Sequence, residues 1–214
     1  MPLLNDQTRE EVKKVLDTLD KPITLDLYTL QIECGLCKDT HQLLSEIAEL
    51  TTKITINLHE LESENQHADT LKIEKLPAII IKGEKDYGIR FFGIPAGYEF
   101  TSLVAAMLLV SRGELMLKPE TKAFLDTLQK PVHIEVITTP TCPFCPGMVV
   151  IAHQMAYYSD KVLADMIEIS EFPTVANKYH VEGVPRTVIN EKIFLDGAAP
   201  EDMLVDKIKE ALNV

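Results

Sequence analysis

The sequence lacks tryptophan, long apolar runs and any excess of basic residues. A membrane-spanning helix needs roughly 18 or more consecutive apolar residues, and the longest apolar stretch, near residues 103–110, is far shorter. The first residues do not combine a basic region with an apolar segment, so they do not resemble a secretory signal. These absences predict a cytoplasmic protein that has no membrane partner.

Charge and loop composition exclude further classes of partner. The chain has 33 acidic and 21 Lys or Arg residues, which gives a net charge of −12. Nucleic acids and anionic membranes attract basic surfaces, so we expect neither as a partner. No glycine-rich phosphate-binding loop is present, and the six histidines are scattered along the chain. We therefore expect no bound nucleotide cofactor and no metal site.

What is present is an ordinary globular composition and four paired cysteines. Hydrophobic residues make up 46% of the 214 residues and charged residues 25%, enough for one large domain or two small ones. Every cysteine belongs to a Cys-x-x-Cys pair, Cys34/Cys37 or Cys142/Cys145. Without a secretory signal, such pairs indicate redox or metal chemistry rather than structural disulfides.

The two pairs belong to an internal repeat. The segment 17–22 recurs almost unchanged as 126–131, and a Cys-x-x-Cys pair follows each copy. Pro77 lies 43 residues after Cys34, and Pro185 lies 43 residues after Cys142. This agreement predicts a duplication with domains at 1–117 and 118–214, called below the first half and the second half. The short connection near 112–118 predicts that the halves pack together.

Hydrophobic periodicity predicts the same order of elements in each half. In the first half we expect helices at 8–19, from Cys34 to about 50, at 64–73 and at 98–110, and strands at 23–29, 54–58, 77–81 and 87–92. In the second half we expect helices at 120–129, from Cys142 to about 158, at 174–180 and at 201–212, and strands at 132–138, 162–169, 185–189 and 192–195.

The position of each pair between a strand and a helix suits thiol chemistry. The unpaired N–H groups and the dipole at a helix N-terminus favour a thiolate, which is the form that attacks a disulfide. A second cysteine three residues later can then displace the bound substrate. Pro143 suits a first helical turn, whereas Gly35 orders the turn less. We therefore predict that Cys142/Cys145 is the stronger site.

Two other interpretations of the pairs are less favourable. Zinc ribbons place their two Cys-x-x-Cys pairs 15–20 residues apart, whereas here the pairs occupy two copies of a repeat. Inert packing cysteines would not repeat in register with a proline. A non-catalytic zinc-binding module remains an alternative that metal analysis would separate from redox chemistry.

At this level the chain resembles a known family. The segment 138–146 resembles the active site of glutaredoxin-like proteins, 183–187 resembles the cis-proline segment of thioredoxin-like proteins, and the tandem pairs together with 86–97 resemble the protein disulfide oxidoreductases of thermophilic archaea and bacteria. The resemblance implies an α/β fold of two tandem thioredoxin-like units, each with a central mixed four-stranded sheet flanked by helices.

The resemblance also implies site residues, an activity and partners. Pro77 and Pro185 would be cis and would face the cysteines, while the backbones of Leu76 and Val184 would pair with an extended substrate. The chain would be an enzyme that reduces, oxidises and isomerises protein disulfides. Its only redox groups would be the disulfides, with no bound cofactor, and a thioredoxin-reductase-like flavoenzyme using NADPH would supply electrons.

Two points stay open. Thioredoxin has a buried acid six residues before its first cysteine, but Tyr28 and Val136 stand there in this chain. Asp26 and Glu135 are candidate proton acceptors instead, and the alternative is that they face solvent or pair with a basic residue.

The second point is an alternative function, an electron relay that feeds a peroxiredoxin, like the N-terminal module of the alkyl hydroperoxide reductase flavoprotein. That module has one active pair, so the intact first pair argues against this alternative.

Overall fold

The computed structural model describes residues 2–30, 34–61, 73 and 75–213. In the first half the elements are α1 (Asp6–Leu16), β1 (Ile23–Leu30), α2 (Cys37–Ala48), β2 (Ile54–Leu61), β3 (Ala78–Lys82), β4 (Asp86–Phe92) and α4 (Glu99–Arg112). The order agrees with the sequence-based prediction. The predicted helix at 64–73 lies, apart from Ile73, outside the described residues. β2 continues beyond the predicted 54–58 because it pairs with β1 as far as Leu61.

The second half repeats this order, as predicted. Its elements are α5 (Pro119–Asp126), β5 (Val132–Thr138), α6 (Cys145–Tyr158), β6 (Val162–Glu168), α7 (Pro173–Tyr179), β7 (Arg186–Ile189), β8 (Ile193–Asp196) and α8 (Glu201–Leu212). Pro119 begins α5, where a missing N–H leaves no bond unmade. Gly113 ends α4 in the left-handed conformation that favours glycine.

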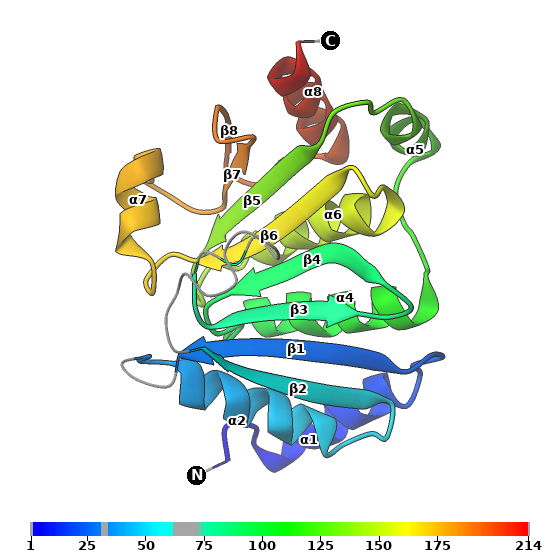
Figure 1. Cartoon of the computed structure of the whole chain (residues 1–214), viewed down its shortest axis with the longest axis vertical. Helices are drawn as coiled ribbons and strands as arrows, with labels where there is room; N and C mark the ends of the chain where they lie inside the picture. Colours follow the sequence, from blue (N-terminus) through cyan, green and yellow to red (C-terminus); the bar gives the residue numbers. More distant parts are fainter. Residues whose placement is uncertain (1, 31–33, 62–72, 74, 214) are drawn as a thin grey trace.

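The strands form one continuous mixed sheet rather than two separate ones. Its order is β2-β1-β3-β4-β6-β5-β7-β8 (Figure 1). Each half supplies four strands, which confirms the predicted four-stranded units. The halves join where β4 and β6 pair in parallel, from Ile89 opposite Ala164 to Phe92 opposite Ile167. The connection is therefore a backbone hydrogen-bond ladder, which holds the halves in one fixed relation.

Helices cover both faces of the sheet, as predicted. The larger apolar cluster lies on the face that packs against α1, α2, α4, α5, α6 and α8. The smaller cluster lies on the other face, where Val175 and Tyr179 of α7 pack against strand residues such as Ile80 and Val188. Within the described residues, no helix is long and apolar enough to span a membrane.

The connection between the halves is tied to the helix layer. Residues 113–118 run from α4 to α5, and the backbone N–H of Met116 donates to Oε1 of Gln154 in α6 at 2.6 Å. A second hydrogen bond, 2.9 Å from the N–H of Lys118 to Glu201, reaches α8. These bonds give the connection little freedom, in agreement with the expectation that the halves pack together.

Candidate functional site

The two cysteine pairs lie on the same side of the sheet, beyond the C-terminal ends of β1 and β5. β1 and β5 run in the same direction, because β1 and β4 are both antiparallel to β3 while β4, β6 and β5 are mutually parallel. Their arrowheads accordingly point to the same side in Figure 1. Each strand leads into a Cys-x-x-Cys pair whose second cysteine begins a helix, Cys37 in α2 and Cys145 in α6. The sequence predicts that the helices begin at Cys34 and Cys142, but they begin three residues later, so the first cysteine of each pair and Pro143 lie in the turn that precedes the helix.

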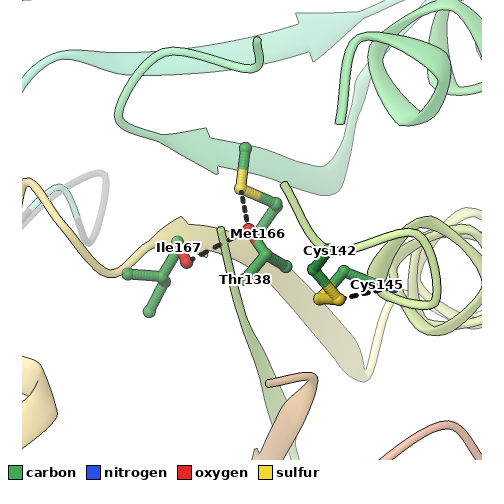
Figure 2. Close-up of a disulfide and its surroundings, with 5 residues drawn as sticks. All are labelled: Thr138, Cys142, Cys145, Met166 and Ile167. Atoms are coloured by element: carbon green, nitrogen blue, oxygen red, sulfur yellow. Dashed lines mark hydrogen bonds between the residues drawn. A yellow bond between two sulfur atoms is a disulfide. The ribbon is translucent and has the colours of Figure 1, made fainter. Parts of the chain in front are cut away.

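Each pair is closed as a disulfide, with Cα atoms 5.4 Å apart in the first pair and 5.5 Å apart in the second. In the second pair the backbone N–H of Cys145 donates to Sγ of Cys142 at 3.1 Å (Figure 2). When the disulfide is open, the same N–H stabilises negative charge on that sulfur. The geometry favours Cys142 as the attacking sulfur.

The second cysteine pair is buried near the C-terminal end of β5. Cys142 is 6% exposed and Cys145 is fully buried. Figure 2 shows Thr138, the last residue of β5, pointing toward β6, where its hydroxyl lies 3.3 Å from Sδ of Met166 and 3.4 Å from the carbonyl oxygen of Ile167. In the first pair Cys37 is buried but Cys34 is partly exposed. The two attacking sulfurs therefore differ in access to solvent.

The prolines predicted from the repeat have the expected backbone form. The Leu76–Pro77 and Val184–Pro185 bonds are both cis. Each proline carbonyl accepts a matching hydrogen bond, at 2.9 Å from Gly93 and at 2.8 Å from Gly197. In the first half Leu76 and Pro77 line one pocket with Cys34. That each proline and the residue before it face the cysteine pair of their half stays a prediction.

Asp26 and Glu135 lie on the sheet face away from the helices that carry the cysteines. Each alternates along its strand with residues of the larger apolar cluster, Leu25 and Leu27 in β1 and Ile134 and Val136 in β5. Because successive side chains of a strand point to opposite faces, the two acids point toward the side of α7.

Both acids have basic or polar partners on that face. Asp26 forms an ion pair with Lys82 and accepts a 2.9 Å hydrogen bond from Asn57. Burial acts to raise the pKa of Asp26, but these hydrogen bonds outweigh burial and lower the pKa below its usual value. Glu135 accepts a 2.5 Å hydrogen bond from the hydroxyl of Tyr179, and its other oxygen is 3.8 Å from Nζ of Lys75. The arrangement favours the alternative in which each acid pairs with a basic residue.

Glu135 also belongs to the one group of described side chains that could together hold a metal ion. One ligand atom each from His133, Glu135 and Asp165 lie within 4.8 Å of one another. Nε2 of His133, however, is 2.6 Å from Asp165, and Glu135 is already engaged by Tyr179 and Lys75. These mutual contacts account for the burial of the group without a metal.

Glu99 is a candidate functional residue that sequence reasoning missed. It lies in the first turn of α4 and is fully buried, and neither carboxyl oxygen has a hydrogen-bond partner among the described residues. Burial raises the pKa of Glu99 to about 7, although the nearby Ser102 acts in the opposite direction. Its sequence signal was present but ambiguous, because an acid that opens an otherwise apolar helix is also typical of an ordinary N-terminal turn.

The start of α4 contacts the loop that leads to the second cysteine pair. Leu109 of α4 and His153 of α6 line a shared pocket near the far ends of the two helices. At the near end, the backbone N–H of Tyr98 donates to the carbonyl oxygen of Pro140 at 2.9 Å. The helices therefore run parallel (Figure 1), and the residue before α4 contacts Pro140, two residues before Cys142.

Gly97 permits this approach. Its φ is +59°, and a Cβ there would lie 2.2 Å from the carbonyl oxygen of Pro140. Only glycine combines that conformation with that clearance. The first half is therefore in direct contact with the loop that positions Cys142.

Comparisons with known proteins agree with the fold and the pairs. A thioredoxin-domain family model matches residues 132–210. A protein disulfide oxidoreductase from Aeropyrum pernix is 30% identical, with a TM-score of 0.90 over 98% of this chain and 94% of its own. The structure of the alkylhydroperoxide reductase AhpF from Enterococcus faecalis is 27% identical, with a TM-score of 0.86 over 96% of this chain and 99% of its own.

A curated relative is longer than this chain. The alkyl hydroperoxide reductase AhpF of Escherichia coli is 27% identical over 209 residues, which cover 96% of this chain. The chain spans 37% of the length of that relative. The similarity therefore concerns one part of the longer protein.

Proposed function

This chain belongs to the protein disulfide oxidoreductases with two thioredoxin-like folds, and we propose that each of its halves, 1–117 and 118–214, exchanges electrons with protein disulfides through its own cysteine pair. The observation that carries the proposal is that each half has a Cys-x-x-Cys disulfide at the start of a helix, and that both disulfides follow the C-terminal end of a strand in one shared sheet. The activity comprises reduction and oxidation, with isomerisation where a substrate thiol re-attacks.

At the second pair, reduction proceeds through a mixed disulfide. The thiolate of Cys142 attacks one sulfur of the substrate disulfide, a bond forms between the two, and the other substrate sulfur leaves as a thiolate. The sulfur of Cys145 then attacks Cys142 and releases the first substrate sulfur. Two electrons pass to the substrate, and the Cys142–Cys145 disulfide forms. At this pair the backbone of Val184, next to Pro185, pairs with the extended substrate segment. Leu76 and Pro77 have the same role at the first pair.

Proton transfer during the second attack is assigned to Glu99. Cys145 must lose its proton before it attacks, and it is fully buried, so solvent is a poor acceptor. Glu99 is a buried carboxyl directly after Tyr98, whose backbone N–H donates to Pro140 of the loop that leads to this pair, and burial raises the pKa of Glu99 to about 7. A pKa near the working pH suits a group that accepts and returns a proton. Asp26 and Glu135, which have basic or hydroxyl partners on the other face, take no part in this scheme.

The test is reduction of insulin disulfides by the full chain, with dithiothreitol as the electron source. The chain with both pairs intact accelerates the reaction, whereas a variant with all four cysteines replaced by serine adds nothing to the rate with dithiothreitol alone. Equal rates for the two proteins would contradict the proposed activity. Metal analysis of the same preparations addresses the zinc alternative, since a zinc module would contain stoichiometric metal.

A second function, electron relay to a peroxiredoxin, is favoured by the similarity to the alkyl hydroperoxide reductase AhpF over 96% of this chain. In this role a thioredoxin-reductase-like flavoenzyme reduces the chain with NADPH in the cytoplasm. Consumption of NADPH by such a reductase, this chain and a peroxiredoxin with hydroperoxide measures the relay. Insulin as the final acceptor measures the general activity. Consumption with hydroperoxide but not with insulin would favour the relay.

A further inference from the structure

The pocket at the first cysteine pair has walls from both halves. It has a volume of ≈ 460 Å³, and Cys34, Leu76 and Pro77 of the first half line it together with residues 171–174 of the second half. The second-half residues lie between β6 and the first turn of α7. Because β4 and β6 pair in parallel, the segment that follows β6 lies on the same side of the sheet as Cys34, beyond the C-terminal ends of the strands.

Of the residues that the structure describes, two charged side chains, Lys75 and Glu171, line this pocket, and they differ in how far their charges are neutralised. The side chain of Lys75 is 13% exposed, and its ammonium is 3.8 Å from Glu135 and 4.8 Å from the centre of the Phe92 ring. Its charge is therefore directed toward the protein. Glu171 accepts a 2.6 Å hydrogen bond from the backbone N–H of Ile94. Among the described residues, no cationic side chain lies within ion-pair distance of Glu171.

The backbone at Gly93 restricts the position of the Glu171 side chain. Gly93 has a φ of +85°, and a Cβ added there would lie 2.6 Å from Oε1 of Glu171. One oxygen of the Glu171 carboxylate is thus held against the Gly93–Ile94 backbone, and the residue lines the same pocket as Cys34. Phe172, Pro173 and Thr174 of the same segment also line the pocket, so this wall contains two apolar side chains and one hydroxyl.

We propose that residues 171–174 of the second half form one wall of the polypeptide groove of the first cysteine pair, and that Glu171 selects substrates with a lysine or arginine beside the half-cystine. This inference rests on the proposed disulfide exchange at Cys34. Leu76, Phe172 and Pro173 offer apolar contacts to an extended chain, and the carboxylate of Glu171 is the charge that a neighbouring basic side chain meets. The net charge of −12 adds long-range attraction for basic substrates.

The test isolates the first pair by replacing Cys142 and Cys145 with serine. The probes are two synthetic disulfide-bonded peptides that differ only in a lysine or a glutamine next to the half-cystine, with dithiothreitol as the electron source. The measured quantity is the ratio of kcat/KM for the lysine peptide to kcat/KM for the glutamine peptide. Glu171→Gln keeps an oxygen for the Ile94 N–H, so the backbone contact is preserved.

We expect Glu171→Gln to lower this ratio about threefold, the size of a partly exposed ion pair. Glu120→Gln, which removes the same charge from an exposed position on α5, leaves the ratio unchanged. Glu171→Gln combined with Cys34→Ser and Cys37→Ser also leaves the ratio unchanged, because only the second pair then works. An unchanged ratio in the first-pair protein, or an equal fall in the second-pair protein, would overturn the proposal.

Hydroxyethyl disulfide separates failure of the groove from failure of the chemistry. If the first-pair protein does not reduce this small disulfide, the proposed exchange at Cys34 is wrong, and the groove proposal falls with it. If it reduces hydroxyethyl disulfide but shows no response of the peptide ratio to Glu171→Gln, the groove proposal alone is wrong.

Discussion

The two cysteine pairs occupy equivalent places in the repeat but differ in their surroundings. Cys34 is partly exposed and lines a pocket shared with the second half. Cys142 is 6% exposed and follows Pro140 by two residues in the loop that contacts Gly97 of the first half. The surroundings of each pair thus include residues of the other half of the chain. Because the shared sheet fixes both contacts, duplication produced two sites that depend on each other's halves.

The two pairs are also separated. β1 and β5 are four strand spacings apart in the sheet, which is roughly 19 Å. Sulfur atoms must touch to exchange disulfides, so direct transfer between the pairs is excluded while the sheet is intact. A substrate or a reductase must therefore meet each pair separately, and variants of the two pairs can be compared one at a time.

The largest expected effect comes from removing one attacking sulfur at a time. Cys142→Ser is expected to lower insulin reduction more than Cys34→Ser does, since Pro143 orders the turn of the second pair. Loss of the attacking sulfur removes the mixed-disulfide step at its own site, so the residual rate reports the other pair. The measurement is the initial rate of insulin precipitation. A larger loss from Cys34→Ser would reverse the assignment.

The next effect concerns the contact between the first half and the second pair. Gly97→Ala introduces a Cβ 2.2 Å from the carbonyl oxygen of Pro140 at a φ of +59°. We expect a loss of about 3 kcal/mol of folding stability, with strain and overpacking combined, measured by urea denaturation. Gly197→Ala is the matched control, because its φ is +77° but no atom lies within 4 Å of the added Cβ.

The control should cost only about 1 kcal/mol, the strain of the left-handed conformation. The excess for Gly97→Ala then measures the contact alone. Equal losses in the two variants would show that the approach of Gly97 to Pro140 is not tight in solution.

A pH-dependent effect distinguishes Glu99 from exposed acids. Burial raises the pKa of Glu99 from 4.5 to about 7, so the folded state favours the protonated carboxyl. Its contribution to stability is complete below about pH 4.5 and is lost as pH rises through about 7. A shift of this size corresponds to roughly 3 kcal/mol. Glu99→Gln should therefore be the more stable protein at pH 8 and lose that advantage below pH 5.

The measurement is urea denaturation of the oxidised protein across this pH range. Glu120→Gln, at an exposed position, is the control and should follow the unsubstituted chain at every pH. A stability difference for Glu99→Gln that does not change between pH 4.5 and 7 would contradict the assignment of a raised pKa to Glu99.

The smallest expected effect is an absence of change at the second pair. Glu135→Gln is expected to leave the thiol pKa of Cys145 unchanged, because Glu135 faces the side of α7 and is engaged by Tyr179 and Lys75. Glu99→Gln, in contrast, should shift it. Thiol alkylation rates as a function of pH measure both variants. A shift on Glu135→Gln would restore that acid as a proton acceptor.

Much of the site was predictable because its signals are local. The strand before each pair, the helix after it and the proline 43 residues after its first cysteine follow from short-range periodicity and from the repeat, although each helix begins three residues later than predicted. Backbone preference and burial pattern act over a few residues, so the sequence by itself determined the element order and the two candidate sites.

Tertiary structure alone decided which groups surround those sites. The face of the sheet to which Asp26 and Glu135 point depends on strand parity and on which helix layer packs there, and neither is encoded by spacing from a cysteine. The pairing of β4 with β6 sets which residues of one half reach the other. Glu171 is therefore not recognisable as a site residue in the sequence, since its contact with Ile94 crosses between the halves and arises only when distant strands join. The sequence signal of Glu99 is ambiguous, because only the packing of α4 shows that this acid is buried.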